Sequence, residues 1–305
     1  MTVSDSQDFL DMLQAGDGRT SPDASPPTSA EDDLSGAPDT TQRHFAAPGR
    51  WESVVLECLR LGITDQRVDS LMRVLGWPDE FSCFTIAGTP QSGRTATFQA
   101  IRRAVHDLGG SHCLCGSYHG ICISVIAMGH AVTPEVTCTA VLGAFADSLP
   151  LCLGPARSGV RGASASMRAS LMALTVAPAV KSLQRPMRAD DVLPERALMG
   201  DDDAKDELYA DVYSTLRNSE NADDPTLITV FTFLQTGGSL DATARELSVH
   251  PNTVRYRLKR AAETTGWDAT DPREAYVLQT AIALGTIRDS MDAQDGTFPH
   301  ANGRK

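Results

Sequence analysis

Apolar residues in the middle of the chain follow two alternating spacings. Short apolar runs with extended spacing predict four strands, at 81–87, 112–117, 121–127 and 151–153. Apolar residues three and four positions apart predict five helices, near 51–59, 68–75, 94–108, 134–147 and 160–177. From the first strand onward the order is β-α-β-β-α-β, which is typical of a small α/β sandwich.

The last third of the chain keeps only the helical spacing and predicts four helices within about 65 residues. We expect the first to begin at Asp224-Pro225, because Asp caps a helix and Pro suits its first position, and to end at Gly237-Gly238. Ser239 caps the second helix. The short break Ser248-Val249-His250 before the third helix is typical of a helix-turn-helix.

The third helix begins at Pro251 and ends at Gly266, and the fourth begins at Asp271-Pro272, with Glu274 in the position of a capping box. Apolar and small residues form the inward sides of the last three helices. We expect these to be Leu240, Thr243, Ala244 and Leu247, then Val254, Leu258 and Ala261, then Ala275, Leu278, Ala281, Ile282 and Gly285.

The third helix also has a polar side. With Val254 and Leu258 inward, the exposed side and its flanks consist of Asn252, Thr253, Arg255, Tyr256, Lys259 and Arg260, and Arg257 lies nearer to the core edge. Asn pairs with adenine and Arg with guanine in the major groove, whereas Lys and Thr suit phosphates. We therefore assign Asn252, Arg255 and Tyr256 to base edges or to contacts near them. Thr253, Lys259 and Arg260 are assigned to phosphates, and Arg257 either joins this DNA-binding set or braces the turn.

Charge is distributed unevenly along the 305 residues, whose 27 basic and 39 acidic residues give a net charge of −12. Residues 1–49 hold nine acidic and two basic residues, −7 in all, which leaves −5 for the other 256. This acidic, Pro-rich stretch cannot bury enough apolar surface to fold, so we expect a disordered tail. Residues 250–260, by contrast, hold four basic residues and no acidic one, which favours local contact with phosphates.

The run from Gly237 to Gly285 resembles the C-terminal helix-turn-helix of PucR-type transcription regulators. The likeness rests on the HxNTxRYRL core at 250–258 and on the TGWDxTDPRxA continuation at 265–275. The run also resembles the more widespread Fis-type helix-turn-helix, in which dimers place two recognition helices in successive major grooves. The resemblance implies a bacterial DNA-binding regulator that acts as a dimer or a higher oligomer.

The middle of the chain resembles, in its element order, the degenerate cyclase-like domain that precedes this helix-turn-helix in many PucR-type proteins. Residues 190–198 (DDVLPERAL) resemble the linker of those proteins. Active diguanylate cyclases carry an acidic GGDEF-type signature in the hairpin between the second and third strands, whereas this hairpin reads GSYHG (116–120) and has no carboxylate to hold Mg²⁺. We therefore expect no cyclase activity and a domain that dimerises, senses a ligand, or both.

Three segments together resemble one branch of the family, the actinobacterial regulators of fatty-acid synthesis. They are WESVVLECLRLG (51–62), LPERAL (193–198) and TGWDATDPREA (265–275). The resemblance implies control of lipid biosynthesis genes.

Other clusters admit competing interpretations. His112, Cys113, Cys115, His119 and Cys122 invite a zinc site, but CxC is not the spacing of a structural zinc site, and strand alternation places Cys113 and Cys115 together on a buried face. A redox role is the alternative for these two cysteines. Residues 92–95 (SGRT) open a helix, where anions bind, yet they lack a nucleotide-binding GxxxxGK[ST] sequence, so an ordinary turn is the simpler interpretation. Tyr118 and His119 are either ligand-site residues or ordinary hairpin residues.

Composition narrows the class of protein. Seven cysteines, an odd number, do not form the framework of a disulfide-rich secreted protein. Apolar runs of about 18 residues are absent from the sequence, and residues 1–13 lack the basic region of a secretory signal. We expect a reduced, cytoplasmic protein without a membrane partner.

These observations together predict an α/β plus all-α fold. Its parts are a disordered acidic tail (1–49), a helical lead-in with a cyclase-like α/β sensor or dimerisation domain (50–215), a PucR-type helix-turn-helix DNA-binding domain (222–289) and a disordered tail (290–305). The predicted function is a dimeric transcription regulator that binds double-stranded DNA sequence-specifically, with no catalytic residue, cofactor or metal. A small-molecule effector and RNA polymerase are its further expected partners. The alternatives are a nucleotide-handling cyclase-like enzyme and a protein-interaction module whose basic helix binds an acidic partner.

Overall fold

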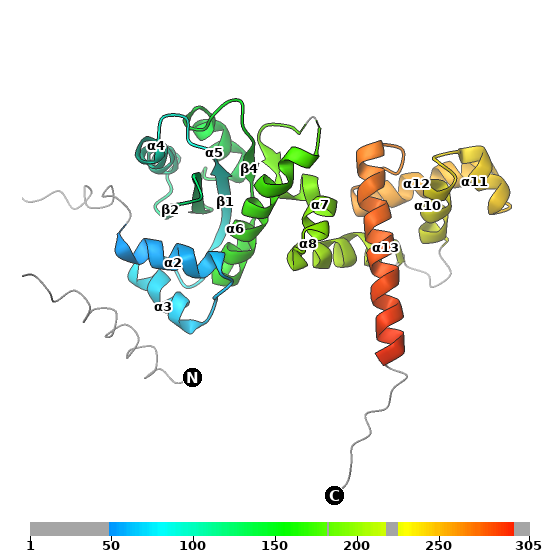
Figure 1. Ribbon diagram of the computed structural model, residues 1–305, viewed down its shortest axis with the longest axis horizontal. Helices are drawn as coiled ribbons and strands as arrows, with labels where there is room; N and C mark the ends of the chain where they lie inside the picture. Colours follow the sequence, from blue (N-terminus) through cyan, green and yellow to red (C-terminus); the bar gives the residue numbers. More distant parts are fainter. Residues whose placement is uncertain (1–48, 182, 218–224, 296–305) are drawn as a thin grey trace, which may run out of the picture. The chain divides into compact units, whose positions relative to one another are not determined.

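The computed structural model describes residues 49–181, 183–217 and 225–295, which form two compact units (Figure 1). The first unit comprises residues up to Leu174 together with Gln184–Met187, and the second comprises Thr175–Leu183 and the residues from Arg188 onward. The predicted acidic tail lies outside the described residues except for its last residue, Gly49, and so do Asp224 and the last ten residues of the chain.

The first unit is built on one sheet with the strand order β2-β3-β1-β4-β6, with β5 paired to β1. Its strands are β1 (Ser82–Gly88), β2 (Cys113–Tyr118), β3 (Ile121–Ala127), β4 (Leu151–Leu153), β5 (Arg157–Ser158) and β6 (Met187–Arg188). The central strand β1 is antiparallel to both β3 and β4. This is the split β-α-β arrangement, so the predicted β-α-β-β-α-β order is confirmed.

Helices cover both faces of this sheet (Figure 1). They are α2 (Arg50–Arg60), α3 (Gln66–Val74), α4 (Arg94–Asp107), α5 (Pro134–Val141) and α6 (Gly159–Val176). Side chains of β1 alternate between the two faces: Cys83 and Ala87 pack with α2, α3 and α6, whereas Phe84 and Ile86 pack with α4 and α5. Because both faces are buried, the strand reads as a continuous apolar run, as the sequence pattern indicates.

The β2–β3 hairpin turns at His119 and Gly120, which have φ angles of 48° and 84°. Two residues with positive φ give the turn whose twist matches the flanking strands. Nearby, Cys115 and Cys122 are buried, Cys113 is half-buried, and the sulfurs of Cys113 and Cys115 lie 3.3 Å apart. All seven cysteines are free thiols. Alternation thus places Cys113 and Cys115 on one side of the strand, as expected.

The second unit is helical and has a single core. Its longer helices are α10 (Thr226–Gln235), α11 (Leu240–Glu246), α12 (Pro251–Thr265) and α13 (Pro272–Asp295). Before them come α7 (Leu193–Leu198), α8 (Asp202–Glu207), the π-helical segment η5 (Leu208–Tyr213) and α9 (Ser214–Arg217). Leu208, Val212 and Tyr213 share their core with residues of α10 to α13. The boundary expected at 215 therefore differs from the structure, which places residues 188–217 with the helix-turn-helix.

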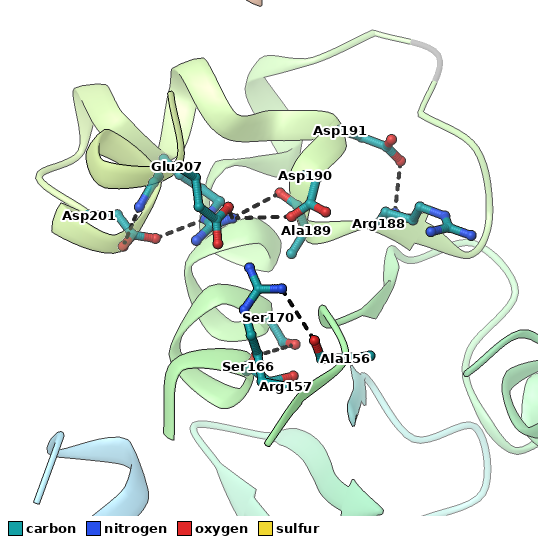
Figure 2. A network of polar contacts seen from close by, with 12 residues as sticks. Ala156, Arg157, Ser166, Ser170, Arg188, Ala189, Asp190, Asp191, Asp201 and Glu207 are labelled. Atoms are coloured by element: carbon teal, nitrogen blue, oxygen red, sulfur yellow. Dashed lines mark hydrogen bonds and ion pairs between the residues drawn. The ribbon is translucent and has the colours of Figure 1, made fainter. Parts of the chain in front are cut away.

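A buried arginine organises the start of this unit. Arg196 of α7 is fully buried, its Nε donates to Asp201 at 2.8 Å, and its Nη1 donates to the carbonyl of Ala189 at 3.3 Å. The carboxylates of Asp190 and Glu207 each lie 3.9 Å from Nη1. Figure 2 shows Asp190, Asp201 and Glu207 directed toward this common centre. A buried guanidinium requires such carboxylates, because an unpaired buried charge is strongly destabilising.

Candidate nucleic-acid interface

Helices α11 and α12 form a helix-turn-helix whose turn is set by local hydrogen bonds. The Ser239 side chain accepts a hydrogen bond from the Ala242 amide, so Ser239 caps α11 as predicted. After α11, Ser248 adopts a left-handed conformation with φ of 53°, and the Val249 amide donates to the Ala244 carbonyl at 2.9 Å. These contacts end α11 and reverse the chain within three residues.

Helix α12 begins directly after this turn. His250 is its N-cap residue, and the His250 Nδ1 accepts a hydrogen bond from the Asn252 amide at 3.2 Å. Pro251 occupies the first helical position, where its missing amide proton costs nothing. Gly266 ends the helix with a left-handed φ of 78°. The predicted start and end of this helix are both confirmed.

One side of α12 is anchored in the core and the other is open to solvent. Val254, Leu258 and Ala261 are buried, which confirms the predicted inward set. Asn252, Arg255, Tyr256 and Lys259 are exposed, and the exposed fraction of Tyr256 is 67%. Thr253, Arg257 and Arg260 are half-buried at the flanks. The structure therefore brings the predicted site residues together on one polar surface.

Two contacts within this surface arrange its polar groups. Arg255 Nη1 donates to Asn252 Oδ1 at 2.8 Å, which joins two residues assigned to base edges. Lys259 Nζ lies 3.6 Å from a carboxylate oxygen of Glu263, and both side chains are largely exposed. An exposed pair at this spacing contributes only about 0.3–0.5 kcal/mol, so a phosphate can replace the carboxylate.

Arg257 differs from its neighbours on α12. Its Nη1 donates to the Thr229 hydroxyl of α10 at 3.3 Å, and that hydroxyl donates to the Pro225 carbonyl at 2.6 Å. The side chain therefore connects α12 to the first turn of α10. This contact favours the bracing alternative over the phosphate contact.

The remaining helices hold α12 in place. The helix α10 begins at Thr226, with Pro225 as its N-cap, so it starts one residue later than expected. Gly237 and Gly238 end it with φ angles of 68° and 79°, as predicted. The hydroxyls of Thr236 and Thr243 lie 2.8 Å apart and link the end of α10 to α11. That last contact joins helix segments that sequence periodicity treats separately.

The start of α13 departs from the expected capping box. Asp271 caps the helix by accepting from the Arg273 and Glu274 amides at 2.8 and 3.0 Å. Glu274 accepts from the amide of Asp268 instead of that of Asp271. The helix also continues through Asp295, beyond the boundary expected at 289. The described part of the predicted C-terminal tail is therefore helical.

Outside the helix-turn-helix, the two histidines of the zinc cluster considered from the sequence make separate local contacts. His112 makes hydrogen bonds with Ser111 and the Gly76 carbonyl, whereas His119 lies beside Tyr118 at the hairpin turn. Within the described ranges, no three His, Cys, Asp or Glu side chains lie close enough to hold a metal ion. The helices of those ranges are also too short or too polar to cross a membrane.

Known proteins show the same two parts in the same order. Residues 226–284 match the PucR C-terminal helix-turn-helix domain, and residues 61–176 match the GGDEF-like domain. A solved structure described as a regulator of polyketide synthase expression, from Bifidobacterium adolescentis, is 57% identical with a TM-score of 0.76. The similarity covers 78% of this chain and 93% of that chain.

Two further relatives extend the comparison. An uncharacterized protein of Mycobacterium tuberculosis is 34% identical over 257 residues, which cover 82% of this chain but 61% of the relative. The purine catabolism regulatory protein of Bacillus subtilis is 31% identical over 96 residues, 32% of this chain and 18% of that protein. The chain thus spans less than two thirds of the length of these curated relatives.

Proposed function

Because the chain belongs to the PucR-type family of transcription regulators, we propose that it binds double-stranded DNA sequence-specifically through α12. The observation that carries this proposal is the division of α12 into a buried apolar side and an exposed polar side. A helix anchored in this way presents its first turns to the major groove while its neighbours hold it at a fixed angle.

Residue roles follow from exposure and side-chain chemistry. Asn252 and Arg255 lie in the first two turns of α12, where recognition helices contact base edges, and Tyr256 stands beside them. Lys259, Arg260 and Thr253 suit phosphate oxygens. Arg257 positions α12 through Thr229 and is not required to touch DNA.

Dimerisation and the regulated genes are part of the same proposal. Two half-sites on DNA require two copies of α12, which a dimer supplies. The three segments that resemble fatty-acid-synthesis regulators support a role in lipid biosynthesis genes. The similar structure named as a regulator of polyketide synthase expression supports a regulatory role of this general kind. A regulator of this kind is proposed to be located in the cytoplasm and to act with RNA polymerase as a partner.

The GGDEF-like domain is proposed to have no catalytic function. Its hairpin presents Gly116, Ser117, Tyr118, His119 and Gly120 where catalysis would need carboxylates for Mg²⁺. Incubation of the chain with nucleoside triphosphates and Mg²⁺ tests the enzymatic alternative. We expect no turnover, and turnover would reverse the assignment.

Selection from a random duplex library tests the DNA-binding proposal without knowledge of the operator. Duplexes that bind the full chain are enriched from the library. Their affinity for the chain is then compared with that of scrambled duplexes by fluorescence anisotropy at fixed salt. We expect the enriched duplex to bind at least a thousandfold more tightly, which is the lower end for specific DNA-binding proteins. Equal affinity for both duplexes contradicts the proposal and favours the protein-interaction alternative.

A further inference from the structure

A cavity of about 580 Å³ lies in the first unit, where α2 and α4 approach the edge strand β2. Its volume lies within the range of small-molecule sites, roughly 300–1,000 Å³. Leu56, Phe98, Ile123 and Met167 line it with buried apolar side chains. Arg60, Arg94 and Arg102 line it with three guanidinium groups. The carboxylate of Glu57 also lines the cavity, which therefore combines an apolar interior with a polar part in which guanidinium groups outnumber carboxylates.

Two of the three arginines already have carboxylate partners. Arg60 donates from Nε and Nη2 to Glu57, at 2.9 and 2.5 Å, and its guanidinium lies 4.5 Å from the ring centroid of Tyr118. Arg102 Nη2 donates to Glu52 at 2.8 Å in a pair whose side chains are 11% and 23% exposed. The Arg102–Glu52 pair joins α4 to α2, whereas the Arg60–Glu57 pair lies within α2.

Arg94 has a neutral partner instead. Its Nη1 donates to the Ser117 hydroxyl at 3.1 Å, and no ion pair connects it to a carboxylate in the part of the chain that the structure describes. A guanidinium has five N–H donors, so most of its donors remain available to a ligand. The first turn of α4, which begins with Arg94, also contains no acidic residue. An anion bound beside Arg94 therefore contacts a guanidinium that has no carboxylate partner among the described residues, and the first turn of α4 contributes no negative charge to repel it.

We propose that this cavity binds a small amphipathic anion, with a phosphate or carboxylate group held by Arg94 and an apolar portion packed against Phe98, Ile123 and Met167. Arg guanidinium recognises both kinds of anion by charge-assisted hydrogen bonds. Ser117 and Thr95, which also line the cavity, supply hydroxyl donors beside it. The proposal goes beyond DNA binding and does not depend on it, because binding is measured on the protein without DNA.

Isothermal titration of the full chain tests the proposal with four probes: n-octyl phosphate, octanoate, 1-octanol and inorganic phosphate. An amphipathic-anion site binds octyl phosphate or octanoate at least tenfold more tightly than 1-octanol or inorganic phosphate. The tighter of the two anions identifies the head group. Binding of 1-octanol as tight as that of both anions, or no binding of any probe, overturns the proposal.

Variants locate the binding site. Arg94→Ala removes a charge-assisted hydrogen bond, so we expect the Kd of the preferred anion to rise about tenfold or more. Arg103→Ala is the matched control, because Arg103 is an exposed arginine of α4 that does not line the cavity. We expect this variant to bind the preferred anion with the wild-type Kd. Arg94→Gln, with an unchanged far-ultraviolet circular dichroism spectrum, separates loss of charge from misfolding. Equal Kd values for the Arg94 and Arg103 variants overturn the assignment.

Discussion

Arg273 and Glu195, 78 positions apart in the chain, are joined by two parallel hydrogen bonds of 2.5 and 2.7 Å. Arg273 also donates to the Asp191 carbonyl at 2.6 Å, and its pKa is raised above the ordinary value by its hydrogen bond with Glu195. Glu195 belongs to the LPERAL segment and Arg273 to the TGWDATDPREA segment, so two separate motifs meet in one contact. The start of α13 is thereby fixed to α7.

Loss of the contact between Arg273 and Glu195 should destabilise the packing of α13 against α7 in the second unit. We expect Arg273→Ala to lower the stability of the second unit by about 1–2 kcal/mol, less than for a fully buried pair because Arg273 is partly exposed. Arg273→Lys should recover less than half of the stability that Arg273→Ala loses, since lysine cannot form the bidentate contact with Glu195. Hydrogen exchange of α13 amides measures the change. Lys205→Ala, which breaks an exposed pair with Asp202, is the control and should have little effect.

Gly285 of α13 packs directly against the ring of Tyr213. A Cβ built at Gly285 would lie 2.1 Å from the ring, and Tyr213 donates to Asp289 at 2.6 Å, which holds the ring in place. We expect Gly285→Ala to destabilise the second unit by about 1–3 kcal/mol through overpacking, despite the favourable helix propensity of alanine. The same substitution should be neutral or stabilising in a Tyr213→Ala background, as hydrogen exchange would show. Destabilisation of equal size in both backgrounds contradicts the packing argument.

Substitution of Arg257 distinguishes a role in bracing α12 from a direct contact with DNA. If it braces α12 through Thr229, Arg257→Ala should weaken exchange protection in α10 and α12 and leave the salt dependence of DNA binding unchanged. A phosphate contact predicts the opposite: unchanged protection, and a slope of log K against log salt that is smaller by about one. Thr229→Val is the matched variant, because it removes the acceptor while keeping the arginine.

Asn252 should determine sequence preference at one position of the enriched duplex. We expect Asn252→Ala to cost about 1–3 kcal/mol of binding and to relax the preference for one base pair. Because Arg255 donates to Asn252, the double variant with Arg255→Ala should lose less than the sum of the two single losses. Anisotropy titrations with single-base variants of the duplex measure both effects. A uniform loss across all duplexes would instead assign Asn252 to the phosphate backbone.

The sequence pattern predicted the helix-turn-helix in detail because its signals are local. The buried side of α12 follows from helical periodicity, and its ends follow from Pro251 and Gly266. Contacts such as Arg257 with Thr229 require the crossing of two helices, which periodicity does not specify, so the sequence left the role of Arg257 open. The same limit applies to the cavity, whose arginines come from α2 and α4.

The short helices between Leu193 and Arg217 were not predicted as parts of the DNA-binding unit. Their sequence, rich in Asp and Glu, shows no sustained apolar period. Their structure depends on Leu208, Val212 and Tyr213, which pack with residues of α10 to α13. Tertiary packing of this kind overrides weak local propensity.

Lys259 provides the clearest test of phosphate contact. Its side chain is 76% exposed and shares a weak contact with Glu263, so Lys259→Ala should leave the fold intact. Each phosphate contact releases condensed counterions, and its loss should reduce the slope of log K against log salt by about one without changing which duplex is preferred. Arg103→Ala is the control, because it removes the same single positive charge from the first unit. This variant should leave the slope of log K against log salt unchanged. A fall in slope for both variants would show that total charge, and not a contact of α12, governs the attraction to DNA.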